Sequence, residues 1–268
     1  MKITGKTFAT KKEEIDYLVK HNKEIIEFKK AVVKHTTPTT TEAEISSTLK
    51  ALSTSKEHDT DSIIKRTVIG NTYNWLDSHG DVHLEGTFGK SISERQNKIW
   101  HLHDHEQKIT AKVGIPSKIY EETVAWSDLG IKKAGTTTAL MMDSDIRKDY
   151  NNLIFQEYKD GNIDQHSVGM YYVKIDFAVN DKDHKAEFKV WNDNIENIGN
   201  REKAEELGYF YAVKEAKLVE ISAVLQGSNE LTPTIEAKDI EPEQSTQANE
   251  PEQSTQKINN NLRNNFLI

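Results

Sequence analysis

The chain has 268 residues, with 35 Lys and Arg against 43 Asp and Glu, so its formal net charge is −8. It contains no cysteine, which excludes disulfides, thiolate zinc sites and a cysteine nucleophile. The acidic balance argues against broad nucleic-acid binding. Because no apolar run reaches the length of a signal-peptide core or a membrane span, we expect neither a leader nor membrane insertion.

Residues 11–34 are predicted to form an amphipathic helix, because apolar residues recur near helical spacing. Acidic residues lie in its first turns and lysines near its end, an order that suits the helix dipole. We expect this helix to pack on the body or on a copy of itself; the alternative is a docking helix for an assembly partner. The rest of the 1–60 region is rich in Thr and Ser and is predicted to be a linker.

The segment 236–268 is predicted to be a disordered tail. From Glu241 it reads EPEQSTQAN and then EPEQSTQKI, an imperfect repeat, and between Glu236 and Gln256 it holds six acidic residues and one Lys. Such a composition cannot bury enough apolar surface to offset the entropy of ordering.

Residues 61–235 are predicted to form one β-rich α+β domain, most simply a barrel or a strongly bent sheet with a few packed helices. Helices are predicted over 144–159, with Ser144 as its N-cap, and over 200–207, ended by Gly208. The strands are predicted from β-branched and aromatic enrichment at 67–76, 83–89, 97–103, 108–115, 136–142, 167–179, 186–191 and 216–225.

Three histidines alternate in His101-Leu102-His103-Asp104-His105. In a straight strand they would share one face, but they would spread over about 13 Å, too far to bind one ion together. We therefore favour a catalytic base from this cluster over a metal site. The alternative is that the histidines only form an exposed polar strand face.

Two further residues could complete a nucleophilic site. Ser167 opens a predicted strand two residues before Gly169, and Glu220 lies within an apolar strand, where a carboxylate that points inward needs a partner. A serine, a histidine that takes its proton and an acid that orients the imidazole would form a hydrolytic triad. The residue types alone leave this as one option beside purely structural roles.

Four motifs occur in an order that resembles the prohead maturation serine proteases of tailed bacteriophages, which resemble the herpesvirus assemblin proteases. They are DSHGDVHLEGTFGKSI, IWHLHDHEQKITAKV, HSVGM and LVEISAVLQGSNELTP, within about residues 64–235. The resemblance implies an assemblin-like barrel, with His103 of a His-Asp pair as base, Ser167 of Ser-x-Gly as nucleophile and Glu220 of Glu-x-Ser as acid.

The chain departs from that pattern at His166, where an apolar residue is usual, and at Thr110, where Gly is common. Because the assemblin relatives use a second histidine as the third member, His101, His105 and His166 remain alternatives to Glu220.

The resemblance implies a serine endopeptidase of phage capsid maturation that needs no cofactor or metal. Its substrates would be the scaffold protein or the scaffolding segment of the major capsid protein, and the chain itself, inside the procapsid in the host cytoplasm. We also expect self-association, and no nucleic-acid or membrane partner. The alternatives are a non-enzymatic assembly module on an inactive protease fold and a metal-dependent hydrolase built on His101, His103 and His105.

Overall fold

The computed structural model describes residues 6–34 and 59–236. By its internal contacts the chain divides into two units, residues 1–238 and residues 239–268, and only the first contains described residues. The predicted linker lies almost entirely outside the described residues, and so does the predicted tail beyond Glu236.

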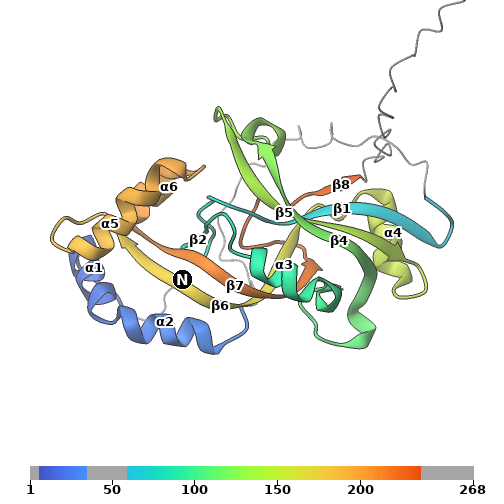
Figure 1. Ribbon diagram of the computed structural model, residues 1–268, viewed down its shortest axis with the longest axis horizontal. Helices are drawn as coiled ribbons and strands as arrows, with labels where there is room; N and C mark the ends of the chain where they lie inside the picture. Colours follow the sequence, from blue (N-terminus) through green and yellow to red (C-terminus); the bar gives the residue numbers. More distant parts are fainter. Residues whose placement is uncertain (1–5, 35–58, 237–268) are drawn as a thin grey trace, which may run out of the picture. The chain divides into compact units, whose positions relative to one another are not determined.

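The described part is a mixed α+β fold with six α-helices and one β-rich sheet (Figure 1). The helices are α1 (Lys11–Lys20), α2 (Asn22–Ala31), α3 (Gly89–Arg95), α4 (Asn152–Asp160), α5 (Lys185–Asn194) and α6 (Arg201–Leu207). The strands are β1 (Ile63–Thr72), β2 (Asp81–His83), β3 (Trp100–His103), β4 (Lys112–Ala125), β5 (Thr136–Arg147), β6 (His166–Val179), β7 (Tyr209–Ala223) and β8 (Thr234–Glu236).

The sheet has eight strands in the order β2-β7-β3-β4-β5-β1-β8, and β6 pairs with β7. The long strand β7 therefore has β6 on one side, antiparallel, and β2 and β3 on the other, both parallel. Among the described residues the sheet is not closed, so the predicted barrel is not shown, whereas the β-rich α+β class is confirmed.

Several predicted elements have the wrong type or the wrong bounds. The strand predicted over 186–191 is wrong, because these residues lie in α5, where Trp191 is buried in one core with Ala178 of β6 and Phe210 of β7. The strand β5 continues through Ser144, so Asn151 and not Ser144 caps the following helix, with its side chain accepting a hydrogen bond from Ile154 N. Residues 84–88 of the strand predicted over 83–89 lie outside β2.

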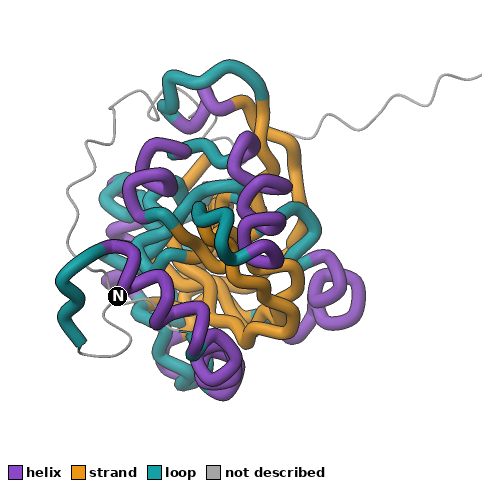
Figure 2. Tube along the Cα trace, turned by 90° about the vertical axis from the view of Figure 1, so that its left-hand side faces the viewer, coloured by secondary structure: helices purple, strands orange, loops and turns teal. Residues whose placement is uncertain are grey.

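The N-terminal helix is divided in two at His21. Thr10 caps α1 by accepting a hydrogen bond from the backbone of Glu13. Ile15, Leu18 and Ile25 belong to the same buried core as the central strands, so these helices and the sheet share one core. Figure 2 shows the helices at the N-terminus lying across the strands.

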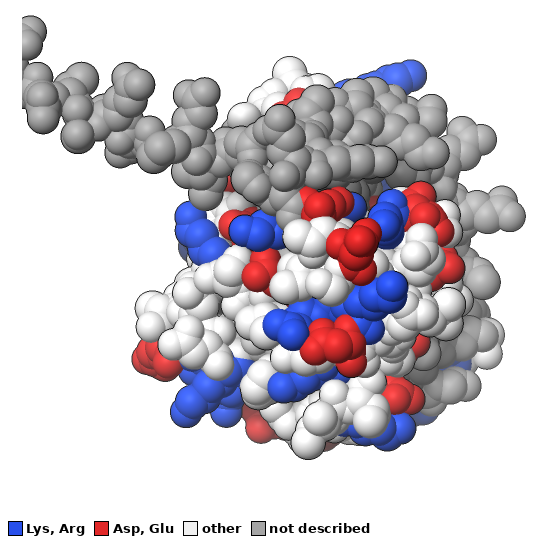
Figure 3. Space-filling model, turned by 90° about the vertical axis from the view of Figure 1, so that its right-hand side faces the viewer, with Lys and Arg blue, Asp and Glu red and all other residues white. Residues whose placement is uncertain are grey.

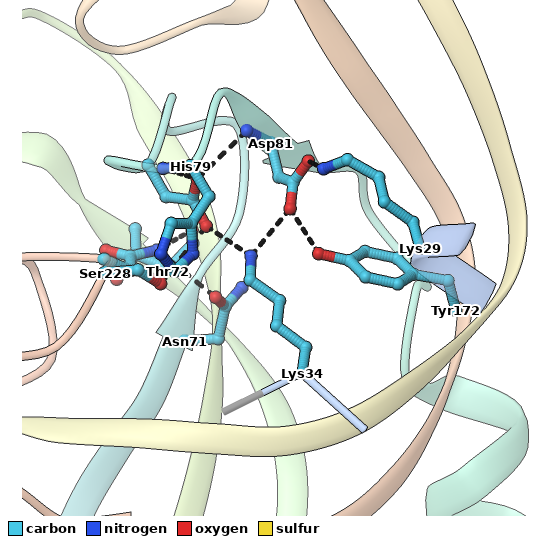
Figure 4. Close-up of polar contacts among 10 residues, drawn as sticks. Lys29, Lys34, Asn71, Thr72, His79, Asp81, Tyr172 and Ser228 are labelled. Atoms are coloured by element: carbon cyan, nitrogen blue, oxygen red, sulfur yellow. Dashed lines mark hydrogen bonds and ion pairs between the residues drawn. The ribbon is translucent and has the colours of Figure 1, made fainter. Parts of the chain in front are cut away.

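A buried group of charges fastens this N-terminal segment to the sheet (Figure 4). Lys29 Nζ lies 2.5 Å from Asp81 Oδ1, and Lys34 Nζ lies 2.7 Å from both Asp81 Oδ2 and Asp77 Oδ2. Tyr172 also donates a hydrogen bond to Asp81. Burial alone would raise the pKa of Asp81, but the two ammonium groups lower it below its usual value.

The backbone of Lys34 also reaches the strand that carries Ser167. Its N–H donates a 2.9 Å hydrogen bond to Met170 O on β6. The segment that ends at Lys34 is thus joined to β6 by both a backbone bond and buried ion pairs.

The surface drawn in Figure 3 mixes positive and negative side chains, and its described part shows no continuous basic stripe. None of the described helices is both long and apolar enough to span a bilayer.

Candidate active site

The strands β6 and β7 bring two of the predicted residues to one face. In their antiparallel register Ser167 is opposite Ser222, and Gly169 is opposite Glu220. Directly opposed residues point to the same side of a sheet, so Ser167, Ser222 and Glu220 share a face, here called the site face. The neighbouring residues Val168 and Ile221 point into the main core, on the opposite side of the sheet, here called the core face.

His103 does not join them. In the parallel ladder of β3 and β7, His101 pairs with Ile221 and His103 with Ala223, which places both histidines on the core-face side. The His103 ring lies 3.0 Å from Asp104 Oδ2, and its side chain is 21% exposed. The structure thus brings Ser167 and Glu220 together but leaves the predicted base on the other side of the sheet.

His105, and not His103, contacts Glu220. After β3 ends, Asp104 and His105 both adopt left-handed backbone conformations, with φ of 51° and 56°. This turn folds His105 back over β7, where its backbone N–H donates a 3.2 Å hydrogen bond to Ser222 Oγ. Its ring Nδ1 lies 2.7 Å from Glu220 Oε1.

The contact with Glu220 sets the tautomer of the His105 ring. A carboxylate only accepts hydrogen bonds, so Nδ1 carries the proton and Nε2 is left with a lone pair. Ser222 donates a hydrogen bond to the second carboxylate oxygen, Glu220 Oε2. Glu220 is fully buried and the His105 side chain is 7% exposed, so this acid–imidazole pair is shielded from water.

Gly169 makes room for that pair. A Cβ atom added to Gly169 would lie 1.9 Å from Glu220 Oε1, so the carboxyl group leans from β7 over β6. The carboxyl group thus leans toward β6, the strand on which Ser167 lies two residues before Gly169. Ser167 is 4% exposed, so a peptide can reach its hydroxyl only if covering groups move aside.

The other two histidines form a separate network on the core face. His166 Nδ1 donates to Thr232 O at 3.0 Å, so its Nε2 accepts from the Tyr158 hydroxyl at 2.8 Å. The Tyr158 oxygen in turn accepts from His101 Nε2 at 3.0 Å, and His101 Nδ1 accepts from Ser144 at 2.9 Å. Every residue of this network has its hydrogen-bond partners when both imidazoles are neutral.

Burial keeps these imidazoles uncharged. It lowers the pKa of His166 to about 4, against a smaller opposing effect of the hydrogen bond to Thr232. Burial, together with the neighbouring His166, also holds the pKa of His101 well below its usual value. Both histidines therefore serve the core and lie on the opposite face from Ser167.

A pocket of about 450 Å³ borders Glu220 on the β3 side. Trp100 and Leu102 of β3, with Ile109 and Val219, supply apolar walls, and Lys112 of β4 supplies a charge. Trp100 and Leu102 pair with Glu220 and Ser222 in the ladder, so the pocket opens on the site face. Sequence reasoning missed it because its walls come from three strands and a loop.

The three histidines of the 101–105 motif do not converge on one point, since His101 and His105 contact groups on opposite faces. Among the described residues, the group with metal-ligand spacing is Asp16, Asp181 and His184. Lys12 already lies 3.2 Å from Asp181 there, so the acidic charge is partly neutralised by the protein itself.

No family model, curated protein or solved structure matches this chain.

Proposed function

We propose that this protein is a serine endopeptidase whose catalytic residues are Ser167, His105 and Glu220. The observation that carries the proposal is the buried contact of His105 Nδ1 with Glu220 Oε1, on the face that Ser167 shares. A buried acid that fixes an imidazole beside a serine is the arrangement by which hydrolases activate a hydroxyl.

In the proposed reaction Ser167 Oγ attacks the carbonyl carbon of a peptide bond, and its proton passes to His105 Nε2. Glu220 accepts the hydrogen bond from Nδ1 and stabilises the imidazolium. The C–N bond then breaks, and Nε2 returns the proton to the departing amine. Water hydrolyses the acyl ester by the same proton transfers, which regenerates the Ser167 hydroxyl.

The substrate we propose is the scaffold protein or the scaffolding segment of the major capsid protein of a tailed phage, inside its procapsid in the host cytoplasm. The support is the order of the four sequence motifs, three of which contain or border the residues of this site. The open, curved sheet is, in this proposal, a variant of the assemblin-like barrel. The 4% exposure of Ser167 suits an enzyme that stays latent until assembly opens the site.

Co-expression with the neighbouring capsid and scaffold proteins tests the proposal. Mass spectrometry should show that wild type shortens these proteins and itself, whereas Ser167→Ala and His105→Ala should leave every chain at full length. His103→Ala is the matched control and should process normally, because His103 lies on the other side of the sheet.

Equal processing by wild type and Ser167→Ala would refute the protease and favour the non-enzymatic assembly module. Loss of processing in His103→Ala with full activity in His105→Ala would restore His103 as the base and refute the role of His105.

A further inference from the structure

The pocket beside Glu220 has the features of a binding site for one substrate side chain. Its volume of about 450 Å³ falls within the range of small ligand sites. Trp100 is 44% exposed and Ile109 is 87% exposed, so the apolar walls are not filled by the described chain.

Lys112 gives this pocket a positive charge. Its Nζ lies 4.1 Å from the centroid of the Trp100 ring, and among the described residues no carboxylate is within ion-pair distance of it. Lys108, the other cation of the pocket, is bound to Glu106 at 3.2 Å. The Glu220 carboxylate makes its hydrogen bonds with His105 and Ser222 rather than with Lys112.

The sheet sets the distance between this pocket and the nucleophile. Ser167 lies on β6 and Trp100 on β3, with β7 between them. Two strand spacings amount to about 10 Å, which an extended peptide covers in about three residues. The pocket therefore suits a side chain two or three residues from the bond that is cut.

We propose that this pocket binds a glutamate side chain of the substrate, two or three residues from the scissile bond. The aliphatic stem packs against Trp100 and Leu102, and the carboxylate pairs with Lys112. A purely apolar side chain would cover the Lys112 ammonium without giving it a partner, which is costly. This inference rests on the proposed peptidase function and adds the substrate class.

Cleavage of a peptide mixture made from a digested proteome tests it. For wild type, mass spectrometry of the products should show that Glu is preferred over Gln at that position by about fivefold, the effect of one solvent-accessible ion pair. Lys112→Glu should reverse the preference to Lys or Arg. Lys118→Glu is the matched control, because Lys118 lies on the same strand, over the Tyr120 ring at 4.4 Å, outside the pocket.

Cleavage without a Glu preference, or a preference that survives Lys112→Glu, would overturn this inference and leave the peptidase standing. Cleavage that is unchanged in Ser167→Ala would instead overturn the peptidase, whereas absent cleavage of free peptides is what a latent enzyme predicts. The pocket is then judged by binding alone, with capped Ala-Glu-Ala-Ala and Ala-Gln-Ala-Ala peptides and tryptophan fluorescence on Ser167→Ala. Tighter binding of the Glu peptide that Lys112→Glu abolishes supports the pocket, and equal binding of both peptides refutes it.

Discussion

His105 and Glu220 are 115 positions apart in the chain, yet their Nδ1 and Oε1 atoms lie 2.7 Å from each other. The contact exists because β3 and β7 run parallel as neighbours and the turn after β3 folds back over β7. It joins a histidine from a loop to an acid in the centre of the sheet.

Glu220→Gln should abolish processing while the protein stays folded. The amide keeps the shape of the side chain but can donate to Nδ1, which favours the wrong tautomer of His105, and a comparable change in a serine protease lowers kcat by about 10⁴. The rate of capsid-protein shortening measures the loss, and circular dichroism measures the fold. An unchanged rate would show that Glu220 is structural only.

Gly169→Ala should separate the acid from the imidazole, since the new Cβ would lie 1.9 Å from Glu220 Oε1. We expect processing to fall at least tenfold, about the effect of 1.4 kcal/mol on the barrier. Gly89→Ala is the matched control, because a Cβ there meets its nearest neighbour at an ordinary 3.9 Å. Equal activity of the two variants would contradict the proposed arrangement.

Lys34→Met should destabilise the fold by about 3–5 kcal/mol, because it removes the ammonium group that pairs with the buried charges of Asp77 and Asp81. Lys30→Met is the control; its ion pair with Glu27 is exposed and should change the free energy of unfolding by less than about 1 kcal/mol. Urea unfolding measures both. Similar midpoints would mean that the buried pairs do not hold the N-terminal helices.

Acid should weaken the fold between pH 6.5 and pH 4. The folded pKa of His166 is about 4, against an ordinary value of 6.5, so in this window the unfolded chain binds a proton that the folded chain does not. The free energy of unfolding therefore falls as the pH is lowered through this window.

His166→Gln removes this titration. From pH 7 to pH 4.5 wild type should lose about 2 kcal/mol more than the variant, whatever the variant's own stability at pH 7. Urea unfolding at the two pH values gives both differences. A variant with the same pH slope as wild type would show that His166 does not titrate in this way.

Much of the fold was predictable from local pattern, because β3, β6, β7 and α6 have clear apolar or capping signals. The segment 186–191 was not, since its few apolar residues fit helical spacing as well as a short strand. In the structure Trp191 and Ile195, four residues apart, both enter one core, which decides for the helix.

The sequence predicts Ser167 and Glu220 for the site, and the structure places these two residues on one face of the sheet. Their catalytic role stays a prediction. The contact of His105 with Glu220 was not predictable, because strand alternation places His103 and His105 on the same side. Two successive left-handed residues without glycine reverse that expectation, and such residues are uncommon in proteins.

The contacts of the N-terminal segment also determine when this segment can dock during synthesis on the ribosome. Lys12 bonds to Asp181 and Asp183, 169 and 171 positions later, so α1 is translated long before its partners exist. At ordinary elongation rates the delay is roughly 10–35 seconds. Because Glu220 lies on β7, a nascent chain has no His105–Glu220 pair until its last long strand has emerged.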